Sequence, residues 1–109
     1  MVLDRFSLQG KVAIVTGCNT GLGQGMARAL AQAGADVVGV NMTAPQETER
    51  QVTESGRRFL DVRADLADSH CIEPVLRQAL AWGGHVDILV NNAGIIRRED
   101  AIRFSEKDW

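Results

Sequence analysis

The residues best suited to bind a ligand in this 109-residue chain are the glycines of the segment TGCNTGLG, Thr16–Gly23. In the spacing GxxxGxG, Gly17 lets the backbone turn sharply, Gly21 lets it approach a bulky anion, and Gly23 lets a helix pack closely against a strand. The N–H groups at the start of that helix would face a phosphate, each contact contributing about 0.3–1 kcal/mol. No Gly-Lys-Ser/Thr follows, which excludes a P-loop. The spacing therefore predicts a diphosphate bound by backbone groups, with a purely structural turn as the alternative.

A second candidate is Asn41, which follows the loop by roughly 20 residues, where a dinucleotide site needs a polar group for the adenosine ribose. Its carboxamide can bond to a ribose hydroxyl but lacks the charge that would repel a 2′-phosphate. No arginine or lysine lies at positions 18–20 or 42–44 to attract that phosphate. The sequence therefore favours NAD over NADP, with an ordinary residue of a strand-end turn as the alternative for Asn41.

No residue of the chain is a good candidate for catalysis or for metal binding. The sequence has no tyrosine, and no His/Cys/Asp/Glu cluster has metal-ligand spacing. His70 falls at the start of a predicted helix and His85 at the amino end of a predicted strand, where histidines of solvated turns are the better interpretation. The serines have no partners for nucleophilic attack. We therefore assign no catalytic residue and no metal ligand.

The elements that must position these residues alternate in type along the chain. Short apolar runs rich in β-branched residues predict strands over residues 11–15, 36–41, 58–62 and 86–90. Apolar residues at helical spacing predict one helix with the stripe Leu22, Met26, Leu30 and Ala33, and another with the stripe Ile72, Val75, Leu76, Ala79 and Leu80. A polar, exposed helix is predicted over residues 45–54.

This alternation predicts an α/β fold, a Rossmann-like parallel sheet with helices on both faces and strand order 3-2-1-4. Ligands bind such a sheet at the carboxyl ends of the strands on either side of the point where the order reverses. Gly17 and Asn92 both fall there. We place no domain boundary within residues 1–109. Strand 86–90 has no later partner and Ser105 to Trp109 begins a helix of barely one turn, so we expect the amino-terminal portion of a longer protein.

Composition makes several kinds of partner poor candidates. Twelve basic and fourteen acidic residues give a net charge of −2, which offers no field for nucleic acid or for an anionic membrane. No apolar run approaches the roughly 20 residues that cross a bilayer. The two cysteines, Cys18 and Cys71, follow no disulfide or metal pattern, which favours a reducing, cytoplasmic location.

The chain resembles the short-chain dehydrogenase/reductase family. The resemblance rests on TGCNTGLG, on the pair Asp65-Leu66, and on NNAG at Asn91–Gly94 preceded by DILV. It implies a nicotinamide dinucleotide as cofactor, of which Asn41 and its neighbours favour NAD, and a homo-oligomer, a tetramer in this family. It also implies three groups of cofactor-binding residues: for the diphosphate Gly17, Asn19, Thr20, Gly21, Leu22 and Gly23; for the adenine Asp65 and Leu66; for the ribose Asn92, Ala93 and Gly94. The alternative for Asp65 is a carboxylate at a helix amino terminus.

A narrower similarity, to the 2-deoxy-D-gluconate 3-dehydrogenases (2-dehydro-3-deoxy-D-gluconate 5-dehydrogenases), rests on LDRFSL, Cys18, GQGM and GIIRR. It implies oxidation or reduction at a CH–OH group of a sugar acid. The family's proton donor is the tyrosine of a Tyr-x-x-x-Lys pair, so we do not expect this chain alone to be catalytically competent. A non-catalytic dinucleotide-binding module is the alternative; a methyltransferase, which also uses a glycine turn, fits the NNAG segment less well.

Overall fold

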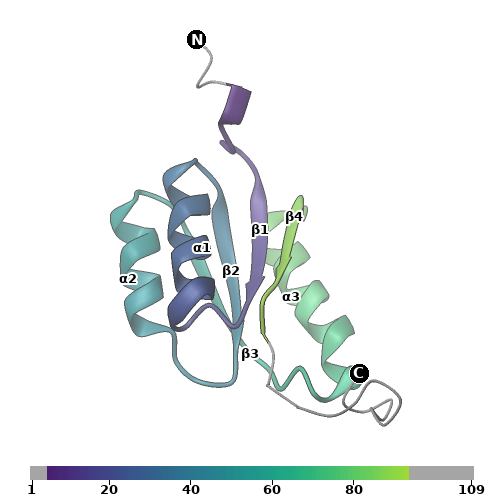
Figure 1. Cartoon of the computed structure of the whole chain (residues 1–109). Coiled ribbons are helices and arrows are strands. Elements are labelled where there is room, and N and C mark those ends of the chain that lie inside the picture. Colours follow the sequence, from purple (N-terminus) through teal and green to yellow (C-terminus); the bar gives the residue numbers. More distant parts are fainter. Residues whose placement is uncertain (1–4, 94–109) are drawn as a thin grey trace, which may run out of the picture.

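The computed structural model describes residues 5–93, in which strands and helices alternate as the sequence predicts (Figure 1). The elements are β1 (Val12–Thr16), α1 (Gly21–Gln32), β2 (Asp36–Asn41), α2 (Gln46–Glu54), β3 (Phe59–Arg63), α3 (Ile72–Gly83) and β4 (Ile88–Asn91), with a short 3-10 helix, η2 (Ser69–Cys71), before α3. Gly84 ends α3 in the left-handed conformation, at φ 81°. The helix predicted from Ser105 lies outside the described residues.

The four strands form one parallel sheet in the order β3-β2-β1-β4, which confirms the predicted topology. Parallel neighbours need crossover connections, and each crossover here carries a helix. Helices α1 and α2 cover one face of the sheet and α3 covers the other (Figure 1). The carboxyl ends of all four strands therefore share one edge, with the ends of β1 and β4 side by side at the reversal of strand order.

Valine-rich strands supply most of the core, and β1 is buried along its whole length. One apolar cluster lies between the sheet and the pair α1 and α2, and it includes Val15, Cys18, Ala27, Ala31, Val37 and Val52. The other lies under α3 and includes Val12, Ile14, Val38, Val40, Val62, Val75 and Ala79. Burial on both faces explains why β1 and β2 carry nearly continuous apolar runs without alternation.

The apolar stripe predicted for α1 matches its packing face only in part. Leu22, the first residue of the apolar stripe, is 79% exposed, and the helix packs instead through Gly23, Ala27 and Ala31. These residues recur every four positions and have little or no side chain. They let the helix axis come so close to the loop after β1 that a Cβ on Gly23 would lie 2.0 Å from the carbonyl oxygen of Gly17. Larger apolar side chains do not fit at this contact, so Leu22 is left in solvent, whereas Leu30 further along the stripe is half-buried against the apolar cluster under the helix.

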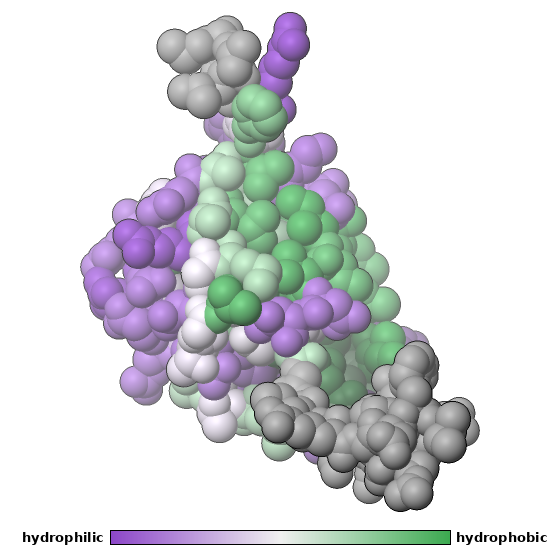
Figure 2. Space-filling model, in the orientation of Figure 1, coloured by the Kyte–Doolittle hydropathy of each residue, from purple (hydrophilic) through white to green (hydrophobic). Residues whose placement is uncertain are grey.

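The apolar stripe of α3 divides between two environments. Val75 and Ala79 are buried against the sheet, whereas the other three residues of the stripe, Ile72, Leu76 and Leu80, are exposed. Leu89 of β4 is also 63% exposed, so the buried central strand predicted at residues 86–90 is only half covered within the described part of the chain. Figure 2 shows hydrophobic residues gathered on the side of β4 and α3, and hydrophilic ones over α1 and α2.

Asp36 fastens the start of β2 to the start of β3, and its removal should destabilise the fold. Its carboxylate accepts hydrogen bonds from the backbone N–H of Arg58 at 3.0 Å and from both neighbouring guanidiniums, those of Arg57 and Arg58, at 3.2 Å. Burial acts to raise the pKa of Asp36, but the hydrogen bonds from Arg58 and Arg57 outweigh it and lower the pKa overall. We expect Asp36→Asn to lower the free energy of unfolding at pH 7 by about 1–2 kcal/mol.

The lowered pKa of Asp36 makes its contribution to stability depend on pH. A carboxyl whose pKa is lower in the folded protein contributes stability above its unfolded pKa of about 3.9, and that stability is lost as pH falls through the folded pKa. Urea unfolding at pH 7 and at acid pH should therefore show the wild type and Asp36→Asn converging on acidification. An equal gap at both pH values would contradict this role of Asp36.

Candidate functional site

The glycine loop, defined as residues 17–23, meets the NNA segment, residues 91–93, at the carboxyl edge of the sheet. Two consecutive N–H groups, those of Asn92 and Ala93, each donate to the Thr16 hydroxyl at 3.0 Å. The Asn92 side chain donates through Nδ2 to the carbonyl oxygen of Gly17 at 3.1 Å. The predicted meeting of these two stretches is therefore confirmed. Gly94 lies outside the described residues.

Two of the three glycines are required by this packing. A Cβ on Gly17, where φ is 64°, would lie 2.9 Å from the Cα of Ala93. A Cβ on Gly23 would collide with the Gly17 carbonyl and would lie 2.7 Å from Nδ2 of Asn92. Gly21 also has a positive φ, 61°, but nothing lies within 4 Å of where its Cβ would be. Gly17 and Gly23 therefore hold strand, loop and helix together, while Gly21 borders open space.

The amino terminus of α1 faces that open space without a capping group. Thr20 precedes the helix in an extended conformation, and its side chain makes no hydrogen bond to the helix. No acidic residue occupies the first turn. The N–H groups of Gly21, Leu22 and Gly23 thus have no side-chain cap, and the positive end of the helix dipole has no carboxylate beside it. This is the arrangement that accepts an anion.

Asn41 ends β2 next to the loop, and its side chain is used to brace that loop. The residue is only 5% exposed. Its Oδ1 accepts from the N–H of Asn19 at 3.2 Å, and its Nδ2 donates to Sγ of Cys18 at 3.3 Å. Burial raises the pKa of the Cys18 thiol, although the bond from Asn41 opposes that shift. One hydrogen and one lone pair of the carboxamide are left for a ribose hydroxyl, so that contact stays a prediction.

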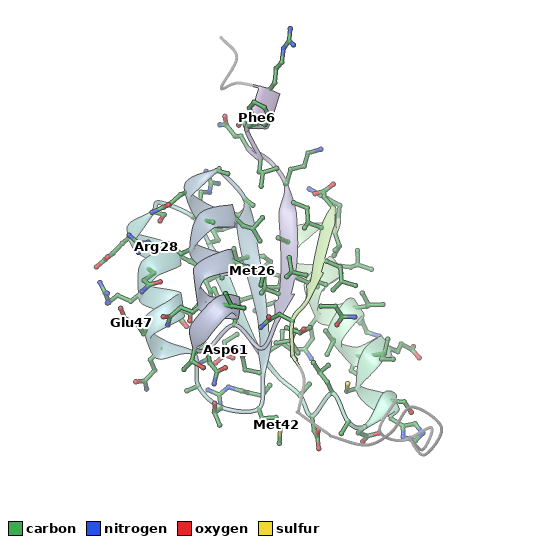
Figure 3. All side chains as sticks on the ribbon, viewed as in Figure 1. Phe6, Met26, Arg28, Met42, Glu47 and Asp61 are labelled. Atoms are coloured by element: carbon green, nitrogen blue, oxygen red, sulfur yellow. The ribbon has the colours of Figure 1, made fainter. Side chains whose placement is uncertain are left out.

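A cation that is distant from Asn41 in the sequence lies beside it in the sheet. In the parallel register Asn41 is paired with Arg63 of β3, so the two side chains leave the same face of the sheet. The Arg63 guanidinium is half exposed and pairs with Asp61 at 3.1 Å. Figure 3 labels Asp61 and Met42 near this edge, far from Phe6 at the other end of the molecule. Positions 18–20 and 42–44 carry no cation, and Arg63 comes beside Asn41 only through the pairing of β2 with β3.

Asp65 and Leu66 follow β3 at the same edge, as predicted. The Asp65 side chain accepts from the N–H of Ala67 at 2.9 Å, and its carbonyl accepts from the N–H of Asp68 at 3.0 Å. Asp65 therefore closes a turn and is not a helix cap; the cap of η2 is Asp68, which accepts from the N–H of His70. Leu66 is partly exposed.

Both histidines lie away from this edge or in solvent. The His70 side chain is 95% exposed and contacts only Asp68 among the hydrogen bonds of the described residues. His85 bonds to the carbonyl of Gly10 at 2.9 Å and to Asp87, whose carboxylate also accepts from the first N–H of β1, that of Val12. His85 is therefore at the amino end of the sheet. Between residues 5 and 93, no group of three His, Cys, Asp or Glu side chains is placed to hold a metal.

Comparison with known proteins places the chain in one family. Residues 11–109 match the short chain dehydrogenase family. The chain belongs to this family. The 2-dehydro-3-deoxy-D-gluconate 5-dehydrogenase of Escherichia coli (strain K12) is 64% identical to it over 109 residues, which are the whole of this chain and 43% of that protein. The chain thus spans less than half of the length of this curated relative.

Solved structures of family members superpose on the described fold. A protein from Agrobacterium tumefaciens assigned as a 2-deoxy-D-gluconate 3-dehydrogenase, with bound NADP, is 46% identical, with a TM-score of 0.69 over 95% of this chain and 40% of that one. A short chain dehydrogenase from Mycobacterium paratuberculosis bound to NAD is 27% identical, with a TM-score of 0.79 over 94% of this chain and 43% of that one. Both nicotinamide dinucleotides thus occur among the structural neighbours.

No helix in the part of the chain that the structure describes has the length and apolar character needed to cross a bilayer.

Proposed function

We propose that this chain is the cofactor-binding part of an NAD-dependent dehydrogenase that acts on a CH–OH group of a sugar acid. The observation that carries the proposal is the junction of the glycine loop with the NNA segment, where Gly21 borders open space beside an uncapped helix terminus. A diphosphate there would accept hydrogen bonds from the first turn of α1 without displacing any side chain. The non-catalytic and methyltransferase alternatives are weaker, since family membership argues for nicotinamide chemistry.

We assign roles to the residues around that junction by their position. Residues Gly17, Asn19, Thr20, Gly21, Leu22 and Gly23 would hold the diphosphate. Asn41 would meet the adenosine ribose, Asp65 and Leu66 would border the adenine, and Asn92 to Gly94 would border the second ribose. All of these residues within the described range lie at the carboxyl edge of the sheet, which supports the assignment. A bound nicotinamide dinucleotide would supply the hydride acceptor or donor.

The substrate class is proposed from similarity alone. The relative from Escherichia coli carries the name 2-dehydro-3-deoxy-D-gluconate 5-dehydrogenase at 64% identity, which favours a six-carbon sugar acid of that type. Proton transfer at the substrate oxygen needs an acid/base group, and the 109 residues contain no tyrosine to provide the family's usual one. We therefore expect this chain to bind the dinucleotide without turning over a sugar acid on its own.

The remaining partners are likewise inferred from the family and from composition. We propose a homo-oligomer, tetrameric by family resemblance, that works in the cytoplasm. Free cysteines support a reducing compartment, because Cys18 is buried and neither it nor Cys71 is paired in the described structure.

Calorimetric titration of the purified protein tests the proposed function directly. NADH should bind at a single saturable site, and S-adenosylmethionine, the methyl donor of methyltransferases, should not bind. A sugar acid with NAD present should give no turnover by the 109-residue chain. Binding of S-adenosylmethionine with none of NADH would overturn the proposal in favour of a methyltransferase.

Asn41→Asp should strengthen the preference for NADH over NADPH. The carboxylate would keep the acceptor for the Asn19 N–H but would add a charge that repels a 2′-phosphate. We expect the ratio of the two dissociation constants to move about tenfold toward NADH, which is about 1.4 kcal/mol of charge repulsion. Titrations of the wild type and of Asn41→Asp with NADH and with NADPH measure this ratio of dissociation constants.

Arg63→Gln, in the neighbouring strand β3, is the variant to compare with Asn41→Asp. It removes the cation beside Asn41, so it should weaken NADPH binding and leave NADH binding nearly unchanged. If neither Asn41→Asp nor Arg63→Gln changes the ratio of the two dissociation constants, the cofactor's adenosine ribose is not recognised by the ends of β2 and β3.

A further inference from the structure

Three consecutive carbonyl groups of the glycine loop accept hydrogen bonds from side chains of the NNA segment, of α2 and of α1. The Gly17 carbonyl accepts from Asn92 at 3.1 Å, the Cys18 carbonyl from the Thr48 hydroxyl at 2.6 Å, and the Asn19 carbonyl from Nε2 of Gln24 at 3.3 Å. In a trans peptide the C=O and the following N–H point in opposite directions. Fixing these carbonyls on the protein side therefore fixes the direction of the N–H groups that follow each of them.

Thr48 of α2 joins two of these contacts. Its hydroxyl donates to the Cys18 carbonyl and accepts from Nε2 of Gln24 at 3.1 Å, the same nitrogen that reaches the Asn19 carbonyl. The side chain is 0% exposed, so water does not compete for its bond to the Cys18 carbonyl. The hydroxyl therefore links α2, α1 and the loop in one network.

Packing alone does not account for a hydroxyl at this position. Val52 lies one helical turn further along the same face of α2, is also fully buried, and fills the apolar cluster under that helix. Valine has nearly the shape of threonine, and burying a hydroxyl costs free energy unless it is hydrogen bonded. The hydroxyl at Thr48 is therefore explained by its hydrogen bond to the loop.

We propose that Thr48 is a positioning residue for the cofactor: its buried hydroxyl, together with Gln24, holds the Cys18 and Asn19 carbonyls away from the diphosphate. A carbonyl oxygen turned toward the diphosphate would repel it. The Cys18–Asn19 peptide is held on its other side by Asn41, which accepts from the N–H of Asn19, and the Asn19 side chain donates to Thr43. Thr48 does not itself touch the diphosphate. The inference rests on the proposed function, since it concerns the loop that would bind the dinucleotide.

The test compares Thr48→Val with Thr48→Ser in the purified protein. Thr48→Val keeps the shape and removes the hydroxyl, so NADH affinity should fall about tenfold, the equivalent of one lost hydrogen bond. In the cofactor-free protein, hydrogen exchange at the Asn19 amide should become faster while exchange at Ile14 in β1 stays the same. Thr48→Ser restores the hydroxyl and should restore both values to within about twofold of the wild type.

Val52→Ala is the matched control, one turn away on the same helix face. It should lower the melting temperature by creating a cavity, but NADH affinity and the ratio of Asn19 to Ile14 exchange should stay at wild-type values. The proposal is overturned if Thr48→Val binds NADH as the wild type does with unchanged exchange, or if Val52→Ala weakens NADH binding equally. Failure of the wild type to bind NADH would instead overturn the proposed function, while the exchange measurements would still decide whether Thr48 holds the loop.

Discussion

Gly21→Val is expected to abolish dinucleotide binding while the far-UV circular dichroism spectrum stays close to that of the wild type. The position has φ 61° and its Cβ would meet nothing within 4 Å, so the new side chain would not collide with the protein. It would project into the space before the first turn of α1, where we place the diphosphate. We expect NADH affinity to fall about 100-fold or more, a loss of about 2.7 kcal/mol, as measured by titration.

Gly56→Val separates the loss of the site from backbone strain. Gly56 follows α2, has φ 80° and also has nothing within 4 Å of its Cβ position. Both variants force a β-branched residue into the left-handed region, at a similar cost of about 1–3 kcal/mol. Only Gly21→Val should lose affinity. If the two variants bind NADH equally well, the diphosphate does not lie at Gly21.

Gly23→Ala should give the largest loss of stability among conservative changes in the loop. The added methyl group would lie 2.0 Å from the backbone oxygen of Gly17 and 2.7 Å from Asn92, so α1 must move away from β1 or the NNA segment must shift. Overpacking of this kind costs about 1–3 kcal/mol, and each kcal/mol lowers the melting temperature of a domain of this size by roughly 4–8 °C. Thermal and urea unfolding followed by circular dichroism measure the loss.

Gly25→Ala is the control on the same helix. Nothing lies within 4 Å of a Cβ at Gly25, and its φ is not positive. The change should therefore be neutral or should stabilise the protein by up to about 1 kcal/mol, because alanine is the better helix former. If Gly23→Ala proves as stable as Gly25→Ala, the close contact between α1 and the loop is not what makes Gly23 necessary.

The strands and their order could be predicted because a parallel sheet covered on both faces imposes a simple pattern. Residues 12–15 form an unbroken apolar run and residues 37–40 one that only Gly39 interrupts, and the intervening helix makes the crossover that parallel pairing needs. The meeting of the glycine loop with the NNA segment follows from the same topology. Strand order alone brings Gly17 and Asn92 to one edge.

The packing face of α1 could not be predicted from hydrophobic periodicity. The contact uses Gly23, Ala27 and Ala31, which such a pattern ranks below Leu22 and Met26 although only small residues fit against the loop. Likewise the spacing of α3 shows that its apolar residues share a stripe, but not that Leu76 remains exposed while Ala79 is buried.

The hydrogen bonds that Thr48, Gln24 and Asn41 make to the loop could not be predicted from the sequence for a different reason. Thr48 follows Cys18 by 30 residues, and only the tertiary structure shows that its hydroxyl reaches the Cys18 carbonyl. The sequence predicts a cofactor contact at Asn41, and the structure adds that both polar atoms of its side chain hold the loop. Arg63 became visible only through its register with Asn41.

Backbone amide chemical shifts, followed by NMR during titration of the purified protein with NADH, test the central claim most directly. The largest changes should occur at Gly17, at Gly21 to Gly23 and at Ala93, on both sides of the junction at the carboxyl edge of the sheet. Changes that cluster on the exposed face of α3 at saturation, with the loop amides unmoved, would contradict the proposed site.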